Sequence, residues 1–182
     1  VWIRDTDGDV VADLRSVFYE GDLSSTIDIS THPETGAIYV ATRTGILRLW
    51  DRDDDGVSDD REKIVFFELK GNFLDNGCAG ICFDENGDVI FGIGSILGEP
   101  YTLEGSDGTA YSDQGEGGNI WRCTIDGENL RRYATGVWNP FGICYTPEGH
   151  MFATDNDPGS RPPCRLHHVL ENGDYGFQYR YG

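Results

Sequence analysis

The chain repeats itself at an interval of 46 residues, and this repeat constrains the fold more than any other feature of the sequence. The two copies share four aspartates at the same spacing: Asp5, Asp7, Asp9 and Asp13 in the first, and Asp51, Asp53, Asp55 and Asp59 in the second. A short apolar stretch follows each copy. The repeated unit is therefore an acidic turn that leads into a strand.

A second unit recurs between and after the acidic turns. It consists of an apolar stretch, a tight turn that ends in Gly36, Gly87 or Gly149, and another apolar stretch. A period of 40 to 50 residues built from short strands is typical of propeller blades. The apolar runs are nearly continuous, which suits a sheet covered on both faces, and no segment has a helical period. We predict an all-β fold, a β-propeller of four-stranded blades.

The length predicts how much of a propeller is present. At the observed period, 182 residues correspond to roughly four blades. The chain starts at Val1 and shows no obvious closing strand, so we expect residues 1–182 to form a single propeller segment, a fragment of a longer chain. Residues 94–118 do not fit the repeat. They form a long, polar, glycine-rich stretch, which is either a functional loop or a disordered surface insertion.

The composition narrows the class of partner. Lysine and arginine total 14 against 32 acidic residues, a formal net charge of −18. Such a chain is a poor partner for nucleic acid or an anionic membrane, and it suits divalent cations. No apolar stretch is long enough to span a membrane. The five cysteines include no C-x-x-C-H motif, so this segment has no covalent haem site.

The second acidic turn matches the twelve-residue calcium loop position by position. Its predicted calcium ligands are Asp51, Asp53, Asp55, Val57 (through its carbonyl), Asp59 and Glu62. Gly56 stands at the sixth position, where the backbone must turn sharply. The flanking segments read as strands, so we expect the loop without the helices of an EF-hand. The alternative is a solvated hairpin turn, because aspartate and glycine favour turns in any case.

The first acidic turn is a weaker copy. Asp5, Asp7, Asp9 and Asp13 are predicted calcium ligands here. Val10 and Ser16 stand where the second copy has its glycine and its glutamate, so calcium should bind less tightly. The expected role of calcium in both turns is structural, since cation binding offsets the repulsion among the carboxylates.

The last third of the chain carries a more distinctive set of motifs. These are Trp138-Asn139-Pro140-Phe141-Gly142, Asp155-Asn156-Asp157-Pro158 and Gly173-Asp174-Tyr175-Gly176. With them the chain resembles the glucose/sorbosone dehydrogenase propellers, the soluble quinoprotein sugar dehydrogenases. It is more similar still to propellers of planctomycete-type proteins labelled membrane-bound dehydrogenases, which are often joined to a c-type haem domain.

The resemblance implies a six-bladed ring with pyrroloquinoline quinone (PQQ) and calcium near its axis. It also implies oxidation of a sugar or alcohol with a histidine as general base, and a periplasmic or extracellular location. The cofactor-binding residues carried over are Trp138, Asn139, Asp155, Asp157 and Pro158. The family has an arginine at the position of Trp138, and tryptophan cannot replace its charge-assisted hydrogen bonds to an anionic cofactor.

The family's catalytic histidine falls on Asp75 and Asn76, which are therefore the catalytic candidates. Asn76 cannot take a proton at neutral pH, whereas Asp75 could. These departures predict weak or absent sugar oxidation with added quinone. Among the histidines, we expect His32 to be exposed beside its turn, and His167 and His168 to face opposite sides of a strand.

Two functions follow from these observations. The first is a quinoprotein-like dehydrogenase that oxidises a small sugar or alcohol and passes electrons to a c-type cytochrome domain outside this segment. The second is a non-catalytic, calcium-stabilised propeller that binds a glycan or a protein partner.

Overall fold

The computed structural model describes residues 1–23, 25–70, 77–156 and 164–181. Within these ranges the chain is built of β-strands, with a single short 3₁₀ helix at Tyr179–Tyr181. No described helix has the length and apolar character that crossing a membrane requires. The predicted all-β class is confirmed.

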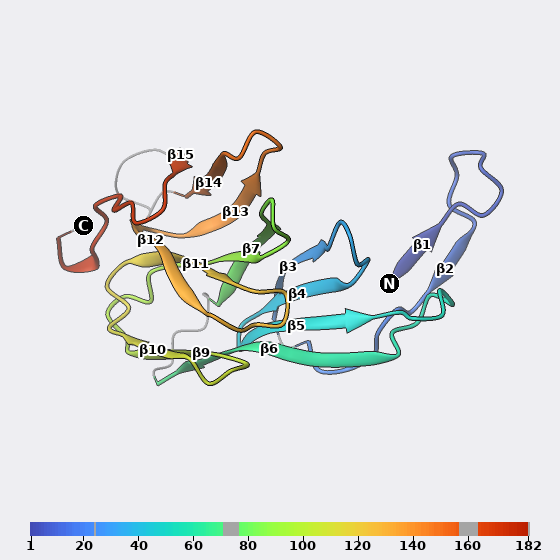
Figure 1. The fold of residues 1–182 in the computed structure, drawn as a ribbon, viewed down its shortest axis with the longest axis horizontal. Helices are drawn as coiled ribbons and strands as arrows, with labels where there is room; N and C mark the ends of the chain where they lie inside the picture. Colours follow the sequence, from blue (N-terminus) through green and yellow to red (C-terminus); the bar gives the residue numbers. More distant parts are fainter. Residues whose placement is uncertain (24, 71–76, 157–163, 182) are drawn as a thin grey trace.

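The described strands form an N-terminal hairpin and three larger antiparallel sheets (Figure 1). The N-terminal hairpin pairs β1 (Trp2–Arg4) with β2 (Leu14–Ser16). The first sheet has the order β10-β9-β6-β5-β4-β3, with β3 (Thr26–Thr31), β4 (Ile38–Thr42), β5 (Gly45–Trp50), β6 (Asp60–Leu69), β9 (Tyr101–Gly105) and β10 (Ala110–Asp113).

The second and third sheets follow the same up-and-down pattern. The second has the order β12-β11-β8-β7, with β7 (Cys78–Phe83), β8 (Val89–Ile93), β11 (Gly118–Cys123) and β12 (Arg131–Val137). The third has the order β13-β14-β15, with β13 (Pro140–Tyr145), β14 (Met151–Asp155) and β15 (Arg165–Val169). The described strands thus include two four-stranded meanders, β3–β6 and β7-β8-β11-β12. The number of blades in a complete ring stays a prediction.

The stretch 94–118 is not an irregular surface insertion. It contributes β9 and β10, and β9 pairs with β6 from Val65 opposite Gly105 to Leu69 opposite Tyr101. Tyr101 is buried, with its ring 5.2 Å from that of Phe67. The hairpin therefore leaves the second sheet between β8 and β11 and widens the first sheet by two strands.

The cores lie between consecutive sheets. One apolar cluster joins the first and second sheets around Tyr39, Phe91 and Trp121, and another joins the second and third around Ile90 and Met151. Every residue of β8 is buried, because the second sheet is covered on both faces. This arrangement explains the nearly continuous apolar runs in the sequence.

His32 is buried, so the expectation of an exposed side chain was wrong. Its Nδ1 accepts hydrogen bonds from the amides of Glu34 and Thr35, both at 3.2 Å. The Nε2 atom then carries the proton and donates to the Gly87 carbonyl at 3.1 Å. Its ring also packs edge-on against Phe83 at 4.7 Å. The imidazole therefore joins the turns of the first and second sheets, a contact between segments far apart in sequence.

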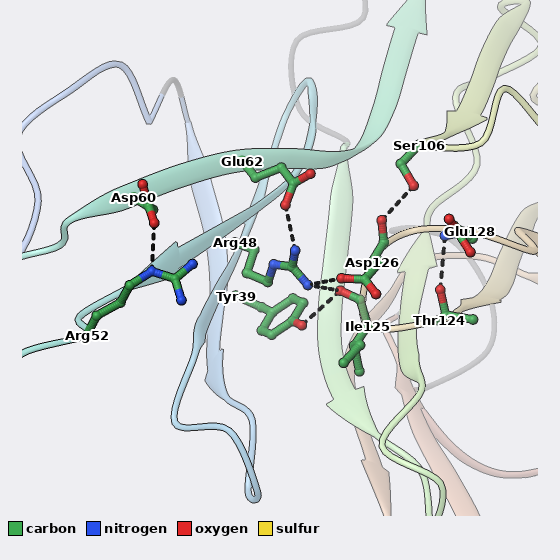
Figure 2. A network of polar contacts seen from close by, with 10 residues as sticks. All are labelled: Tyr39, Arg48, Arg52, Asp60, Glu62, Ser106, Thr124, Ile125, Asp126 and Glu128. Atoms are coloured by element: carbon green, nitrogen blue, oxygen red, sulfur yellow. Dashed lines mark hydrogen bonds and ion pairs between the residues drawn. The ribbon is translucent and has the colours of Figure 1, made fainter.

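Arg48 provides a second link between these two sheets (Figure 2). Its guanidinium bonds Glu62 of β6 at 2.5 Å, and it bonds Asp126 at 2.5 Å and the Ile125 carbonyl at 2.9 Å in the loop after β11. The Tyr39 hydroxyl donates to the same carbonyl at 2.9 Å. Polar groups of the first sheet thus hold the outer loop of the second.

Candidate functional site

The second acidic loop joins β5 to β6 and gathers three carboxylates. One oxygen from each of Asp51, Asp53 and Asp59 lies within 4.8 Å of the others. Gly56 has a φ of 88°, and its amide donates to Asp51 Oδ2 at 3.0 Å. The left-handed backbone at Gly56 folds the loop back on itself, so that carboxylates from both of its ends converge.

The other three predicted calcium ligands, Asp55, Val57 and Glu62, are not part of this carboxylate cluster. Asp55 Oδ1 accepts the amide of Val57 at 2.8 Å. Glu62 lies within β6 and pairs with Arg48 instead of joining the cluster. The loop therefore brings together three of its six predicted calcium ligands, and the strand that follows holds Glu62 in a structural ion pair.

The first acidic loop shares several internal hydrogen bonds with the second. Asp5 Oδ2 accepts the amide of Val10 at 2.8 Å, as Asp51 accepts that of Gly56. One oxygen each from Asp5, Asp7 and Asp9 lies within 4.8 Å of the others. Val10 has a φ of 67°, a conformation that a β-branched residue rarely adopts. The loop thus keeps the shape of its partner although it has lost the glycine.

Asp13, the fourth predicted ligand of this loop, is held by Thr6 through its hydroxyl at 2.6 Å and its amide at 3.0 Å. The Thr6 hydroxyl bond lowers the pKa of Asp13. Hydrogen bonds from the amides of Gly8 and Val10 lower the pKa of Asp5. Both carboxylates are therefore ionised at neutral pH, as cation binding requires.

A second site surrounds Asp155 at the end of β14. Its side chain is 4% exposed, and its carboxylate accepts the amides of Trp138 at 3.1 Å and Asn139 at 2.6 Å. Pro140 opens β13 directly after these two residues. A buried carboxylate needs such donors, because desolvation is costly for an unpaired charge. Asp155 thus fixes the chain where it enters β13.

His167 approaches the same carboxylate from the neighbouring strand β15. Its Nε2 lies 3.3 Å from Asp155 Oδ2, and its ring lies 4.8 Å from that of Tyr175. His168 points to the other side, where it stacks on Phe152 at 5.2 Å. The two histidines face opposite sides of the strand, as predicted. In the tautomer whose Nε2 donates to this carboxylate, Nδ1 is the acceptor nitrogen.

Aromatic and cationic groups complete this site. The Trp138 ring packs edge-on against Phe177 at 4.8 Å. Arg165 lies directly opposite Asp155 in the β14–β15 register and forms no ion pair among the described residues. Asn139 is buried beside the Asp155 carboxylate. The site therefore offers an acid–base pair, an aromatic surface and one cation.

The structure brings together three of the predicted cofactor-binding residues, since Asp155 bonds the backbone of both Trp138 and Asn139. The other predicted residues of this region lie outside the described residues: Asp75, Asn76, Asp157 and Pro158. His167 and Arg165 were missed. Because side chains alternate along β15, His167 and Arg165 lie on the same face of the sheet as Asp155. The pairing of β14 with β15 brings them close to Asp155, and the sequence alone does not show that pairing.

Several solved structures have a similar fold. An aldose sugar dehydrogenase from Streptomyces coelicolor, determined with PQQ bound, has a TM-score of 0.57 and 17% identity, over 81% of this chain and 46% of its own. Two glucose dehydrogenases have TM-scores of 0.62 and 0.57 and identities of 16% and 17%. They match 85% and 92% of this chain, and 49% and 56% of their own.

These likenesses show a glucose/sorbosone dehydrogenase-like propeller fold. The chain spans about half the length of the solved structures that it matches. Residues 1–178 match the family described as a domain of unknown function, DUF7133, and the chain belongs to that family. A search of curated proteins gave no match.

Proposed function

We propose that the protein containing this segment is a quinoprotein-type dehydrogenase of sugars or alcohols, with Asp155 and His167 as its acid–base pair. The observation that supports this most is the contact between a buried carboxylate and a histidine in a dehydrogenase-like propeller. The site also contains Trp138 and Asn139, which the family resemblance marks as cofactor-binding positions.

Oxidation of an alcohol carbon requires the loss of a hydroxyl proton and of a hydride. Asp155 holds the His167 tautomer in which Nδ1 can accept that proton, and its negative charge stabilises the imidazolium that forms. His167 then supplies the base that the sequence placed at Asp75 or Asn76. This base lies on β15, whereas the expected candidates precede β7 in the sequence.

The described residues fit the quinone in its main chemical features. PQQ is planar and anionic, and when bound it accepts the hydride. Trp138 and Phe177 offer it an aromatic surface, and the Asn139 amide can form hydrogen bonds to it. Arg165 offers the positive charge that is lost at Trp138.

The test of the acid–base pair uses the full-length protein with PQQ, calcium chloride and a dye acceptor. We expect His167→Gln to lower the kcat for a panel of aldoses and primary alcohols by about 10²–10⁴-fold. His168→Gln, on the opposite face of the same strand, is the matched control and should keep full activity. Undiminished turnover in His167→Gln would contradict the assignment.

Cofactor binding needs its own measurement, since turnover also depends on the rest of the ring. We expect Arg165→Ala to weaken PQQ binding at least tenfold, measured by quenching of tryptophan fluorescence. Arg131→Ala, a partly buried arginine of β12 that pairs with Glu171, should leave the affinity unchanged. Equal affinities in the two variants would remove Arg165 from the cofactor site.

The acidic loops support a second candidate, a calcium-stabilised propeller that binds a glycan or protein without catalysis. The observation that favours it is that each loop gathers three carboxylates, Asp5, Asp7 and Asp9 in the first and Asp51, Asp53 and Asp59 in the second. At calcium concentrations of 100 times the Kd, a site adds about 2.7 kcal/mol to the free energy of unfolding. For a chain of this size, this corresponds to a rise of about 5–10 °C in Tm.

The calcium test compares melting curves in calcium with curves in chelator. Asp53→Ala should abolish most of the rise, whereas Glu68→Gln, an exposed change in β6, should preserve it. An identical Tm in calcium and chelator would refute structural calcium. If calcium stabilises the fold while no substrate is oxidised, the non-catalytic function is favoured.

The proposal extends to location and electron transfer. We place the protein in the periplasm or outside the cell, with a c-type haem domain beyond residues 1–182 as electron acceptor. Cell fractionation and the haem absorbance of the full-length protein test these two points. A cytoplasmic protein without haem absorbance would overturn both.

A further inference from the structure

The motif Gly173-Asp174-Tyr175-Gly176 follows the third sheet and returns to the second (Figure 1). Asp174 bridges Thr135 of β12 in a parallel direction. The Thr135 amide donates to the Gly173 carbonyl, and the Tyr175 amide donates to the Thr135 carbonyl, both at 2.9 Å. β12 therefore fixes the backbone of the motif on both sides of Asp174.

The Tyr175 side chain reaches back from this position to the third sheet. Its hydroxyl donates to the His168 carbonyl at 2.7 Å and accepts the Leu170 amide at 2.9 Å. Its ring packs against the apolar cluster between the second and third sheets, which includes Ile143 and Met151. The ring is thus held at both ends, by its own backbone on β12 and by its hydroxyl at the end of β15.

Gly173 leaves the space that this ring occupies. A Cβ at position 173 would lie 3.1 Å from Tyr175 Cε2, 3.2 Å from the Tyr175 hydroxyl and 2.9 Å from the Leu170 carbonyl oxygen. Separations this short are below the ordinary contact distance of non-bonded atoms. A side chain at position 173 would therefore displace the tyrosine ring, so the spacing of glycine and tyrosine in the motif has a packing reason.

The ring held in this way lies beside His167, the base of the proposed reaction. The two ring centroids are 4.8 Å apart, with an angle of 57° between the ring planes. Among the described residues, the imidazole makes one hydrogen bond, from Nε2 to Asp155 Oδ2 at 3.3 Å. A single bond of this length does not by itself fix the imidazole against rotation about its Cβ–Cγ bond. Tyr175 supplies the second contact that restricts this rotation.

We propose that Tyr175 is the positioning residue of His167. Its ring keeps Nε2 directed at Asp155 and so leaves Nδ1 as the nitrogen that accepts the hydroxyl proton of the substrate. This inference rests on the proposed function, in which His167 is the base. Tyr175 acts through His167 and is not itself the acid, because its single phenol proton is already donated to the His168 carbonyl.

The first measurement follows the Nε2–H proton of His167 by NMR, in the full-length protein with isotope-labelled histidine and without added PQQ. This proton is assigned by its absence in His167→Gln. We expect Tyr175→Leu to speed its exchange with water by about tenfold, because the aromatic contact that holds the imidazole is lost. With PQQ, calcium chloride and a dye acceptor, the same variant should lower kcat by about 3–10-fold and keep KM within about twofold.

Two further variants separate positioning from packing. Tyr133 packs against the same apolar cluster as Tyr175. Tyr133→Leu should therefore lower Tm about as much as Tyr175→Leu does, while the proton exchange of His167 and the kcat stay at the parent values. Tyr175→Phe keeps the ring, so it should restore slow exchange and most of the parent kcat.

The outcomes that contradict this role differ from a failure of the proposed function. Unchanged exchange in Tyr175→Leu, or equally fast exchange in Tyr133→Leu, would mean that Tyr175 does not position His167. A rise in KM with an unchanged kcat would make Tyr175 a substrate contact instead, and the proposal would be wrong. If the parent protein oxidises no sugar or alcohol, the proposed function fails, whereas the exchange of the Nε2–H proton still decides whether Tyr175 holds the imidazole.

Discussion

Replacing Arg48 with methionine tests whether the polar network of Figure 2 holds the first two sheets together. Methionine keeps most of the apolar stem and removes the guanidinium. Three bonds are lost, to Glu62, Asp126 and the Ile125 carbonyl. All three bonds connect β5 to neighbouring strands or loops. The variant therefore removes these polar contacts and keeps most of the apolar packing of the side chain.

The exposure of the partners sets the magnitude of the loss. The Arg48 side chain is 9% exposed, whereas Glu62 and Asp126 are 52% and 60% exposed. Both carboxylates regain water when Arg48 is removed, so each ion pair contributes less than about 1 kcal/mol. The Ile125 carbonyl keeps the Tyr39 hydroxyl as a donor. Arg48 Nε is buried and has no partner among the described residues, so its removal offsets part of the loss.

The sum of these effects is a loss of about 1–2 kcal/mol in the free energy of unfolding, or about 2–8 °C in Tm. Urea unfolding of Arg48→Met and Glu62→Gln, with the double variant, measures the loss and the coupling between the two residues. Glu62→Gln alone should cost less than about 1 kcal/mol. An Arg48→Met protein as stable as the parent would show that the Arg48 contacts do not help to hold the two sheets together.

Three further predictions follow from contacts described above. Gly87→Ala should lower the free energy of unfolding by about 1–2 kcal/mol more than Gly36→Ala, as measured by thermal unfolding. Both glycines have a positive φ, but only at position 87 would the new Cβ lie 2.8 Å from His32 Nε2. At pH 8 a thiol reagent should modify the exposed Cys144 and Cys164 quickly and spare Cys78 until the protein unfolds, because burial raises the pKa of Cys78 to about 12; rapid modification of Cys78 would contradict its buried position. The hydrogen bond from Thr6 lowers the pKa of Asp13 in the folded protein. The contribution of Asp13 to stability is therefore fully present above the unfolded pKa of about 3.9, and it is lost as the pH falls through the folded pKa. Thr6→Val should raise the pKa of Asp13 in an NMR titration, and an unchanged pKa would refute the role of Thr6.

The acidic loops were predictable because their structure is local. The side chains of Asp5 and Asp51 bond amides within five residues of themselves, so the spacing of aspartates in the sequence already contains the geometry. Even there, a nonlocal contact changed one residue's role. Glu62 occupies the last ligand position of the loop, but Arg48 on the neighbouring strand holds it in the sheet.

The features that the sequence did not predict depend on strand pairing and sheet packing. β9 and β10 lie in a polar, glycine-rich stretch, and only their position beside β6 makes them part of a sheet. His32 looked like a turn residue, and the neighbouring sheet buries it. His167 joins Asp155 through the β14–β15 register, and no spacing within either strand shows that contact.

The second acidic loop also connects calcium binding to the N-terminal hairpin. Arg4 of β1 pairs with Asp54 at 2.8 Å, and the amide of Ser58 donates to the Phe18 carbonyl at 2.7 Å. These contacts attach the N-terminal hairpin and the segment after it to the loop between β5 and β6. A cation that fixes this loop should therefore also strengthen the attachment of the hairpin to the first sheet, although no carboxylate of the cluster has to touch the hairpin.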